Sequence, residues 1–240
     1  MVVLIKILGI DEAGRGSVIG PLVISGVMIE EKDEKKLRKI KVKDSKKLTP
    51  KTREKLVPKI EKIARNIVIL RVPPCKIDAN RKRGINLNQI EAIKMAEIIN
   101  LLEPDMAIVD SPGYNTNKFR DYLWSKLDNK NLELCCENYA DENHPVVSAA
   151  SIIAKVDRDT EIDDLKKKLG YDFGVGYTHD VRTIEFLNRL AEQDGGRLPT
   201  FVRHTWDTAE RIMIEHKQLK VLNFLKNLVK KKTSPIVLQE

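Results

Sequence analysis

Four acidic residues stand at the ends of predicted structural elements and together could bind metal ions. Asp11 and Glu12 follow an apolar run at residues 2–10, Asp110 follows a shorter apolar run, and Asp141 precedes a predicted helix. Carboxylate oxygens are the ligands that Mg²⁺ and Mn²⁺ prefer, and two such ions commonly support in-line attack on a phosphodiester. If the four acids converge, the sequence predicts a site for phosphodiester hydrolysis.

Three of the four acids also have a simpler structural explanation, which stays open at this point. Asp11 and Glu12 could be solvated acids where a strand enters a turn, and Asp141 could cap a helix or lie in its first turn. Adjacent strand residues point to opposite faces of a sheet. Asp11 and Glu12 would therefore serve one site only if the backbone turns after the strand, which Gly14 and Gly16 permit.

Other catalytic chemistries find less support in the sequence. It contains no phosphate-binding loop of the Gly-x-x-x-x-Gly-Lys type, and the glycines around Arg15 lack the third member of a dinucleotide fingerprint. Ser111 lies in no Gly-x-Ser-x-Gly turn. The four histidines show no His-Glu-x-x-His spacing and the three cysteines no Cys-x-x-Cys pair, which disfavours a zinc site.

The composition indicates a folded protein with an excess of positive charge. The 240 residues are 42% hydrophobic and 32% charged, near ordinary globular usage, and the net charge is +8. The pI is about 9.2, which favours a polyanionic partner. Residues 211–232 carry much of the excess, with seven Lys and Arg against one Glu.

No segment predicts membrane insertion or export. The longest stretch without a charge, residues 16–29, is broken by Gly20-Pro21 and is too short to cross a bilayer. Residues 1–10 lack the basic leader of a signal peptide and run directly into Asp11. We therefore expect a cytoplasmic protein without membrane contact, acting as a monomer.

The hydrophobic pattern predicts an α/β fold with a mixed five-stranded sheet flanked by helices. The predicted strands are residues 2–10, 22–29, Asn66–Val72, 106–109 and 132–136. We expect the first strand to be central and to pair with the second as a hairpin. The predicted helices are residues 51–64, 88–102, 117–127, 147–169, 181–192 and 206–232. We expect a catalytic domain at residues 1–178 and a helical C-terminal region at residues 179–240.

Five short blocks in this order resemble the signature of one enzyme family. The blocks are residues 9–16 (GIDEAGRG), 43–49 (KDSKKLT), 109–110 (VD), 140–141 (AD) and 145–155 (PVVSAASIIAK). Together they resemble type 2 ribonuclease H (ribonuclease HII), particularly its archaeal form, over residues 5–207. The resemblance implies a ribonuclease-H-like fold with a helical C-terminal region.

The resemblance also implies a reaction and a cofactor. It implies an endonuclease that cuts the RNA strand of RNA/DNA hybrids and cuts at ribonucleotides embedded in duplex DNA, in DNA replication and repair. Asp11, Glu12, Asp110 and Asp141 match the family's four metal-binding acids. They would hold two Mg²⁺ or Mn²⁺ ions, and cleavage would leave 5′-phosphate and 3′-hydroxyl ends.

A second group of residues matches the family's substrate-binding positions. Gly14, Arg15 and Gly16 match a segment that reads the ribose 2′-hydroxyl with main-chain groups, and Tyr177 matches a tyrosine that packs on the sugar at the RNA-to-DNA junction. Ser45, Lys46 and Lys47 match a block expected to contact substrate, with the two lysines on phosphates.

Two positions depart from the family pattern and bear on substrate recognition. Ser17 stands where Pro usually follows the Gly-Arg-Gly segment, and Thr178-His179 stands where a Pro-Ser pair commonly follows the tyrosine. Neither departure changes an acid. They bear on the detailed pose of the recognition loops, and with it on the preference for a junction.

The same sequence features would also fit two other functions and a further protein partner. A hybrid-binding protein without catalysis would need only the basic C-terminus, and another metal-dependent nuclease would need only the acids. The C-terminal segment also loosely matches a motif by which some archaeal relatives bind the replication sliding clamp, at Gln218, Val221, Phe224 and Leu225. An amphipathic helix packed on the protein body explains that segment equally well.

Overall fold

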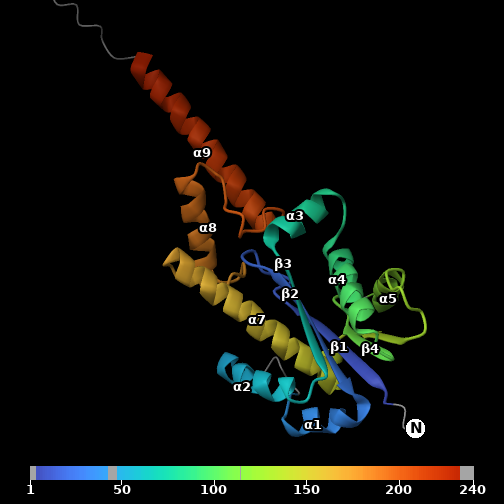
Figure 1. Ribbon diagram of the computed structural model, residues 1–240. Helices are drawn as coiled ribbons and strands as arrows, with labels where there is room; N and C mark the ends of the chain where they lie inside the picture. Colours follow the sequence, from blue (N-terminus) through green and yellow to red (C-terminus); the bar gives the residue numbers. More distant parts are fainter. Residues whose placement is uncertain (1–3, 43–47, 114, 233–240) are drawn as a thin grey trace, which may run out of the picture.

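The computed structural model describes residues 4–42, 48–113 and 115–232, with the side chains of helix α9 described as far as Lys220 and at Leu222 (Figure 1). The strands are β1 (Lys6–Ala13), β2 (Leu22–Glu30), β3 (Asn66–Val72), β4 (Met106–Asp110) and β5 (Glu133–Glu137). The longer helices are α2 (Pro50–Glu61), α3 (Pro74–Lys82), α4 (Leu87–Leu102), α5 (Thr116–Trp124), α7 (Pro145–Leu169), α8 (Val181–Gln193) and α9 (Asp207–Lys232). The shorter ones are η1 (Glu31–Asp33), α1 (Glu34–Lys39) and α6 (Ala140–Asn143).

The strands form one mixed sheet in the order β3-β2-β1-β4-β5. β1 lies at its centre and pairs with β2 antiparallel and with β4 parallel, as the predicted central strand and hairpin require. Because β1 and β4 are parallel, their carboxyl ends reach the same edge of the sheet. This arrangement brings Asp110, the last residue of β4, towards the acids near the end of β1.

Helices cover both faces of the sheet, and each face has its own apolar core (Figure 1). Leu8 and Ile10 of β1 pack with residues of α4 and α5 on one face. Ile7 of the same strand packs on the other face with residues of α1, α2 and α7. This alternation follows from the two-residue period of a strand and confirms the predicted mixed α/β architecture.

Helix α7 crosses β1 at very close range. A Cβ atom on Gly9 would lie 2.6 Å from the backbone oxygen of Val146 and from the backbone nitrogen of Val147. Only glycine fits there, because real side chains do not approach backbone so closely. The first half of α7 is rich in small buried residues, which allow this close approach: Ser148, Ala149, Ala150, Ser151 and Ala154.

The helix starts follow the capping rules. Thr49 caps α2 by accepting a hydrogen bond from the backbone of Thr52, and Pro50 occupies the first helical position. Asn86 and Gln89 form a capping box at the start of α4. α1 and α3 were absent from the predicted elements. α3 begins at Pro74, where proline occupies the first helical position.

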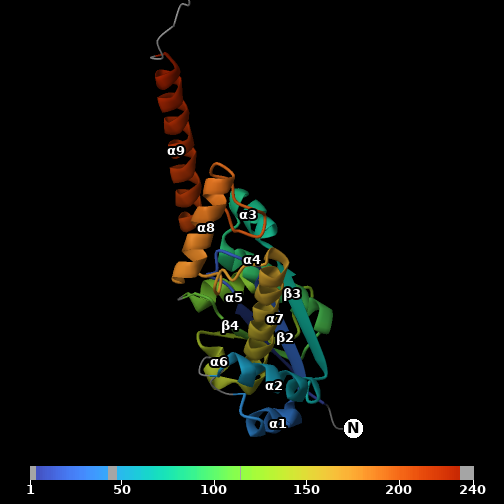
Figure 2. The ribbon, with the colours of Figure 1, turned by 90° about the vertical axis from the view of Figure 1, so that its left-hand side faces the viewer.

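The last two long helices lie side by side and share an apolar cluster with the loop that follows β1 (Figure 2). Val18 and Ile19 of that loop belong to the same cluster as Leu187 of α8 and Ile212 of α9. Beyond this contact α9 projects away from the sheet (Figure 1). No helix within the described ranges is both long and apolar enough to cross a membrane.

Candidate active site

Asp11 and Glu12 lie inside β1, so the expectation that the strand ends at residue 10 is wrong. Asp11 is paired in register with Ser25 of β2 and Glu12 with Ile24, so the ladder continues to Ala13. The turn at Gly14 comes after both acids. The expected turn therefore does not bring the two acids to one side of the strand. They approach each other and Asp110 at the end of the strand instead, closely enough that their charges repel one another.

Asp11 points towards α7 and is almost fully buried, at 4% exposure. The Ser151 hydroxyl donates a hydrogen bond to it, and Lys155 attracts its negative charge. Lys155 Nζ in turn donates to Ser151 Oγ at 2.6 Å. Ser151 and Lys155 lie one helical turn apart on the same face of α7, so the helix presents a hydroxyl and a cation to the acid.

Glu12 points to the α4 face, where a second carboxylate meets it. Glu91 of α4 is fully buried and forms an ion pair with Arg15. The Oε2 atom of Glu12 is buried and has no hydrogen-bond partner within the described part of the chain. A buried carboxylate oxygen without a donor is costly, and a cation is one way to satisfy it.

Asp110 connects the sheet to Asp141. Its Oδ1 accepts a hydrogen bond from the backbone N–H of Ala140 at 3.0 Å. Asp141 is the next residue, in the short helix α6, and is 2% exposed. The backbone oxygen of Asp141 accepts a hydrogen bond from the Ser148 hydroxyl of α7. Asp110 and Asp141 thus belong to one hydrogen-bonded corner between β4, α6 and α7.

Burial and mutual repulsion raise the pKa values of the acids on β1. Burial, followed by the charge of Asp110, raises the pKa of Asp11 from 3.8 to about 7. Burial raises the pKa of Glu12 well above its usual value, and the charges of Glu91, Asp11 and Asp110 raise it further. Without a cation, the protonated forms of Asp11 and Glu12 are therefore favoured to higher pH than in free Asp and Glu.

The acids suit a hard divalent cation. Three of the four, Asp11, Glu12 and Asp110, repel one another, and the donor set is all oxygen. No three Asp, Glu, His or Cys side chains within the described ranges already stand as a metal-binding group. A bound ion would therefore have to draw the carboxylates closer together.

The Gly14–Gly16 loop follows the acids directly. Gly14 has a φ of +80°, and a Cβ there would lie 2.7 Å from the Pro21 carbonyl oxygen, so this position requires glycine. The Arg15 side chain turns towards α4, where it pairs with Glu91 and donates to Asn88 Oδ1 at 2.6 Å. The backbone of the loop is thus its part most suited to substrate.

The loop that carries Tyr177 is bound to the loop after β1. Ser17 and Tyr177 form an isolated antiparallel bridge, and the backbone N–H groups of Val18 and Ile19 both donate to the Gly176 oxygen, at 2.9 and 3.1 Å. Ser17, the departure from the family's usual Pro, is buried and donates its hydroxyl to the Gly14 oxygen at 2.9 Å. The two predicted recognition segments are therefore neighbours.

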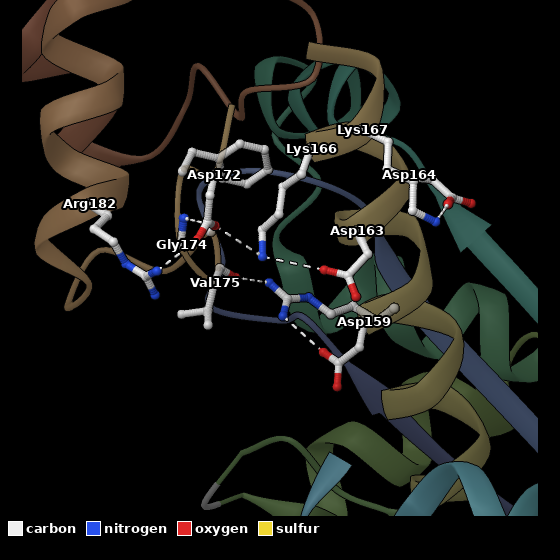
Figure 3. Close-up of polar contacts among 12 residues, drawn as sticks. Asp159, Asp163, Asp164, Lys166, Lys167, Asp172, Gly174, Val175 and Arg182 are labelled. Atoms are coloured by element: carbon white, nitrogen blue, oxygen red, sulfur yellow. Dashed lines mark hydrogen bonds and ion pairs between the residues drawn. The ribbon is translucent and has the colours of Figure 1, made fainter. Parts of the chain in front are cut away.

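Charged groups of α7 and α8 hold the Tyr177 loop in place (Figure 3). Asp172 accepts from the Gly174 N–H at 3.0 Å and pairs with Arg182 at 2.9 Å and Lys166 at 3.3 Å. Arg158 of α7 donates to the Val175 carbonyl. These contacts tie both ends of the loop to rigid helices.

The Tyr177 ring is flanked by two further side chains. The Arg158 guanidinium lies 4.7 Å from its centroid, and the His179 ring stacks on it with centroids 5.4 Å apart. His179 is therefore part of the ring's immediate surroundings, in the place where the family commonly has a small residue. The sequence indicated this departure but not the contact.

A groove of about 580 Å³ runs from Glu12 to the recognition loops. Its lining includes Glu12, Gly14, Arg15, Gly16 and Tyr177, together with the cations Arg53, Lys155 and Arg158. Asp11 and Asp141 are buried beneath the surface, and Asp110 is partly buried. Ser45, Lys46 and Lys47 lie outside the described residues, so their predicted contacts stay predictions.

Sequence reasoning missed several residues of this site. Ser151 and Lys155 fall within a motif block, and their four-residue spacing on a helix could have suggested a shared face. Apart from their charge, nothing in the sequence around Glu91 and Arg158 indicated that they belong to the site. The same holds for Arg203, which contacts the Gly14–Gly16 loop from far along the chain.

The comparisons with known proteins agree with this geometry. A family model for ribonuclease HII matches residues 8–209. The chain belongs to the ribonuclease HII family. Ribonuclease HII of Methanothermobacter thermautotrophicus is 46% identical over 209 residues, which cover 86% of this chain and 98% of the relative. Ribonuclease HII of Methanosarcina barkeri is 43% identical over 218 residues, which cover 88% of this chain and 97% of the relative.

Solved structures show the same relationship. The ribonuclease H2 of Pyrococcus horikoshii superimposes with a TM-score of 0.82 at 43% identity, over 89% of this chain and 99% of the other. The ribonuclease HII of Archaeoglobus fulgidus, solved in complex with PCNA, superimposes with a TM-score of 0.76 at 44% identity, over 85% of this chain and 96% of the other. The chain is a type 2 ribonuclease H, and membership of the ribonuclease HII family supports endonuclease activity on RNA/DNA hybrids.

Proposed function

We propose that this ribonuclease HII cuts the RNA strand of hybrids and also cuts at single ribonucleotides embedded in duplex DNA. The bridge between Ser17 and Tyr177 carries this proposal, because it joins the two loops that would read a ribose beside the acids of β1. An enzyme that hydrolyses any phosphodiester would need the acids but not this pair of loops. Recognition of one ribonucleotide needs both.

In this proposal Asp11, Glu12, Asp110 and Asp141 hold two divalent ions, Mg²⁺ or Mn²⁺. Bound there, the ions supply the positive charge for in-line attack of water on the phosphodiester and departure of the 3′-oxygen. The buried Glu12 oxygen without a donor and the raised pKa of Asp11 support this ligand set.

The remaining residues bind and orient the substrate. The Gly14–Gly16 backbone would donate hydrogen bonds to the ribose 2′-hydroxyl, and Tyr177 would pack on the neighbouring sugar. Lys155 and Arg53 place positive charge in the groove, where the phosphate backbone would run. Ser45, Lys46 and Lys47 would add further contacts from the segment between α1 and α2.

One assay tests the proposal against its two rivals. End-labelled duplexes carrying one ribonucleotide, a full RNA/DNA hybrid or DNA alone are incubated with Mg²⁺, Mn²⁺ or EDTA. We expect metal-dependent cuts in the RNA strand and at the single ribonucleotide, with 5′-phosphate ends, and no cuts in DNA. Binding without cleavage would support a hybrid-binding protein, and cleavage of DNA would support a different nuclease.

We also propose that the end of α9 contacts the replication sliding clamp. The Archaeoglobus fulgidus relative was solved bound to PCNA, and α9 projects away from the sheet, where a partner could reach it. Gln218 begins the loosely matching pattern, while the side chains of Val221, Phe224 and Leu225 lie outside the described part of α9. A cytoplasmic location and a monomeric state likewise stay predictions.

A further inference from the structure

One arginine from the C-terminal region reaches the loop after β1 and binds three of its carbonyl groups. Arg203, in the connection between α8 and α9, donates to the oxygens of Gly14 at 2.7 Å, Arg15 at 2.8 Å and Gly20 at 3.1 Å. Its side chain is fully buried. A planar guanidinium with five N–H donors can serve three acceptors at once, which a lysine ammonium cannot match in geometry.

The backbone around Arg203 is itself fixed. Its N–H donates to the Val18 oxygen at 2.8 Å, and its neighbour Val202 forms an isolated bridge with Ile19. The guanidinium lies 4.8 Å from the centroid of the Trp206 ring. The position of the guanidinium is therefore determined by contacts other than those to Gly14 and Arg15.

Asp78 of α3 holds the residues that follow Arg203. Its two carboxylate oxygens accept hydrogen bonds from the backbone N–H groups of His204 and Thr205, at 2.8 and 3.1 Å. The Thr205 hydroxyl donates to it as well, at 2.7 Å. The connection between α8 and α9 is thus bound to the catalytic half of the chain on both sides of Arg203.

Fixing a carbonyl also fixes the next N–H group. In a trans peptide the C=O of one residue and the N–H of the next point in opposite directions, and no peptide bond is cis in the described residues. With the Gly14 and Arg15 carbonyls turned to the buried Arg203, the N–H groups of Arg15 and Gly16 point the other way. Both residues line the groove, and Arg203 does not.

These two N–H groups are free to bind a ligand. Neither donates a hydrogen bond to any group in the ranges that the structure describes. Two donors whose peptide planes are held before substrate arrives lose little entropy on binding an oxygen acceptor. A ribose 2′-hydroxyl oxygen can accept from these donors, whereas the methylene group of a deoxyribose cannot, so they would favour a ribonucleotide over a deoxyribonucleotide at the same position.

We propose that Arg203 is a positioning residue that sets the N–H groups of Arg15 and Gly16 for the ribose 2′-hydroxyl. The inference rests on the proposed function, in which this loop reads the ribose. It makes the C-terminal region part of the discrimination between RNA and DNA, although no residue there need touch the sugar. Arg203 would act only through the backbone it holds.

The test compares binding to two duplexes of the same sequence, one all DNA and one with a single ribonucleotide. Dissociation constants are measured by fluorescence anisotropy in EDTA, for the wild type, Arg203→Met and Arg203→Lys. We expect the preference of the wild type for the ribonucleotide to fall towards one in Arg203→Met, by up to about tenfold. Arg203→Lys should lie between the two, and the all-DNA affinity should change less than about twofold.

Leu187→Ala serves as the matched control, because Leu187 is fully buried in the cluster shared by α8, α9 and the loop after β1. It should lower thermal stability without changing the preference for the ribonucleotide. If Leu187→Ala lowers the preference as much as Arg203→Met does, general loosening explains the effect and the inference is wrong. If Arg203→Met does not fold, Arg203→Lys and the control decide.

Failure of the inference and failure of the proposed function give different results. Unchanged preference in both Arg203 variants, with a selective wild type, overturns the inference alone. A wild type that binds both duplexes equally and does not cut at the ribonucleotide overturns the proposed function. Equal weakening on both duplexes would make Arg203 a purely structural residue and would also overturn the inference.

Discussion

The Asp110 carboxylate accepts a hydrogen bond at 3.0 Å from the backbone of Ala140, the residue before Asp141. The contact orients Asp110 without neutralising it, because a backbone N–H carries no net charge. It also ties the start of α6 to the end of β4. A neutral side chain of the same shape could keep this contact and lose only the charge, which makes Asp110 the most informative acid to replace.

Asp110→Asn should abolish cleavage and keep the fold. Asn retains an oxygen for the Ala140 N–H, and it removes one of the charges that repel Asp11. We expect turnover with Mg²⁺ to fall by at least about a hundredfold, since the charge of a catalytic ion contributes several kcal/mol. The melting temperature should be unchanged or higher. Asp11, Glu12 and Asp141 should respond similarly.

Asp105→Asn is the control for this experiment. Asp105 precedes the first residue of β4, at the opposite end of the strand from Asp110, and its carboxylate accepts from the Lys6 N–H at 2.7 Å. It should retain normal turnover. Near-normal turnover in Asp110→Asn would contradict the assignment of the acids.

Tyr177→Ala should weaken discrimination at an RNA-to-DNA junction more than it weakens binding to a uniform hybrid. The ring lies in the groove beside Arg158 and His179, and it carries no charge to neutralise phosphates. Stacking on aromatic rings gives a comparable scale of about 1 to 3 kcal/mol per base. Steady-state cleavage of both substrates measures the effect, and Tyr177→Phe should retain most of the discrimination. Equal losses on both substrates would make the ring structural.

Divalent ions should stabilise the protein more at pH 8 than at pH 6. The pKa of Asp11 is raised from 3.8 to about 7 in the folded protein, so folding favours the protonated form. The free energy of unfolding therefore falls as pH rises from about 4 to about 7, and this loss is complete above that range. An ion that needs the ionised carboxylate must displace a proton below pH 7.

The measurement is the rise in melting temperature during titration with Mg²⁺ or Mn²⁺ at each pH. One proton with a pKa of about 7 makes apparent affinity about tenfold weaker at pH 6 than at pH 8. Asp11→Asn should reduce this dependence, and the part that remains should come from Glu12, whose pKa is also raised. A pH-independent shift in the wild type would show that Asp11 is not a ligand.

Removing residues 221–240 should leave the fold intact and weaken duplex binding. The described contacts of α9 lie before this point, including the buried Ile212 and the 3.2 Å contact of His216 with Asn188. The deleted segment contains four lysines. If they contact phosphates, the salt dependence of binding should become shallower, by about 0.9 in slope per lost contact.

The same truncation also tests the clamp proposal. Loss of sliding-clamp pull-down with unchanged duplex affinity would favour the motif that begins at Gln218 over the electrostatic role. Loss of the cooperative melting transition would instead show that the end of α9 belongs to the core, and both functional interpretations would then be wrong.

The sequence predicted the sheet well because its strands are nearly continuous apolar runs. The predicted span of β3, Asn66–Val72, equals the observed one, and β1 lies at the centre of the sheet. The end of β1 could not be predicted, because polar Asp11 and Glu12 look like the start of a turn. Pairing with Ser25 and Ile24 of β2 keeps them in the strand.

In the candidate site, too, the residues in short motifs could be predicted, whereas contacts between segments far apart in the sequence could not. Motif residues such as Gly14 and Tyr177 could be proposed from sequence, since they lie in recognisable short blocks. Their contact with each other depends on the bridge between two distant loops, which no local pattern encodes. The role of Arg203 depends on its hydrogen bonds to three backbone carbonyl groups. Every residue has a backbone carbonyl, so the sequence does not indicate which of them an arginine will bind.

The missing side chain at Gly9 works as a spacer between β1 and α7. The crossing near Val146 and Val147 sets how far the helix axis stands above the strand, and Asp11 lies two residues further along the same face. α7 is a single rigid rod that carries Lys155 near Asp11 and Arg158 under Tyr177. A methyl group at position 9 would push α7 away from β1 and would move Lys155 relative to Asp11 and Arg158 relative to Tyr177, so one close contact sets both distances.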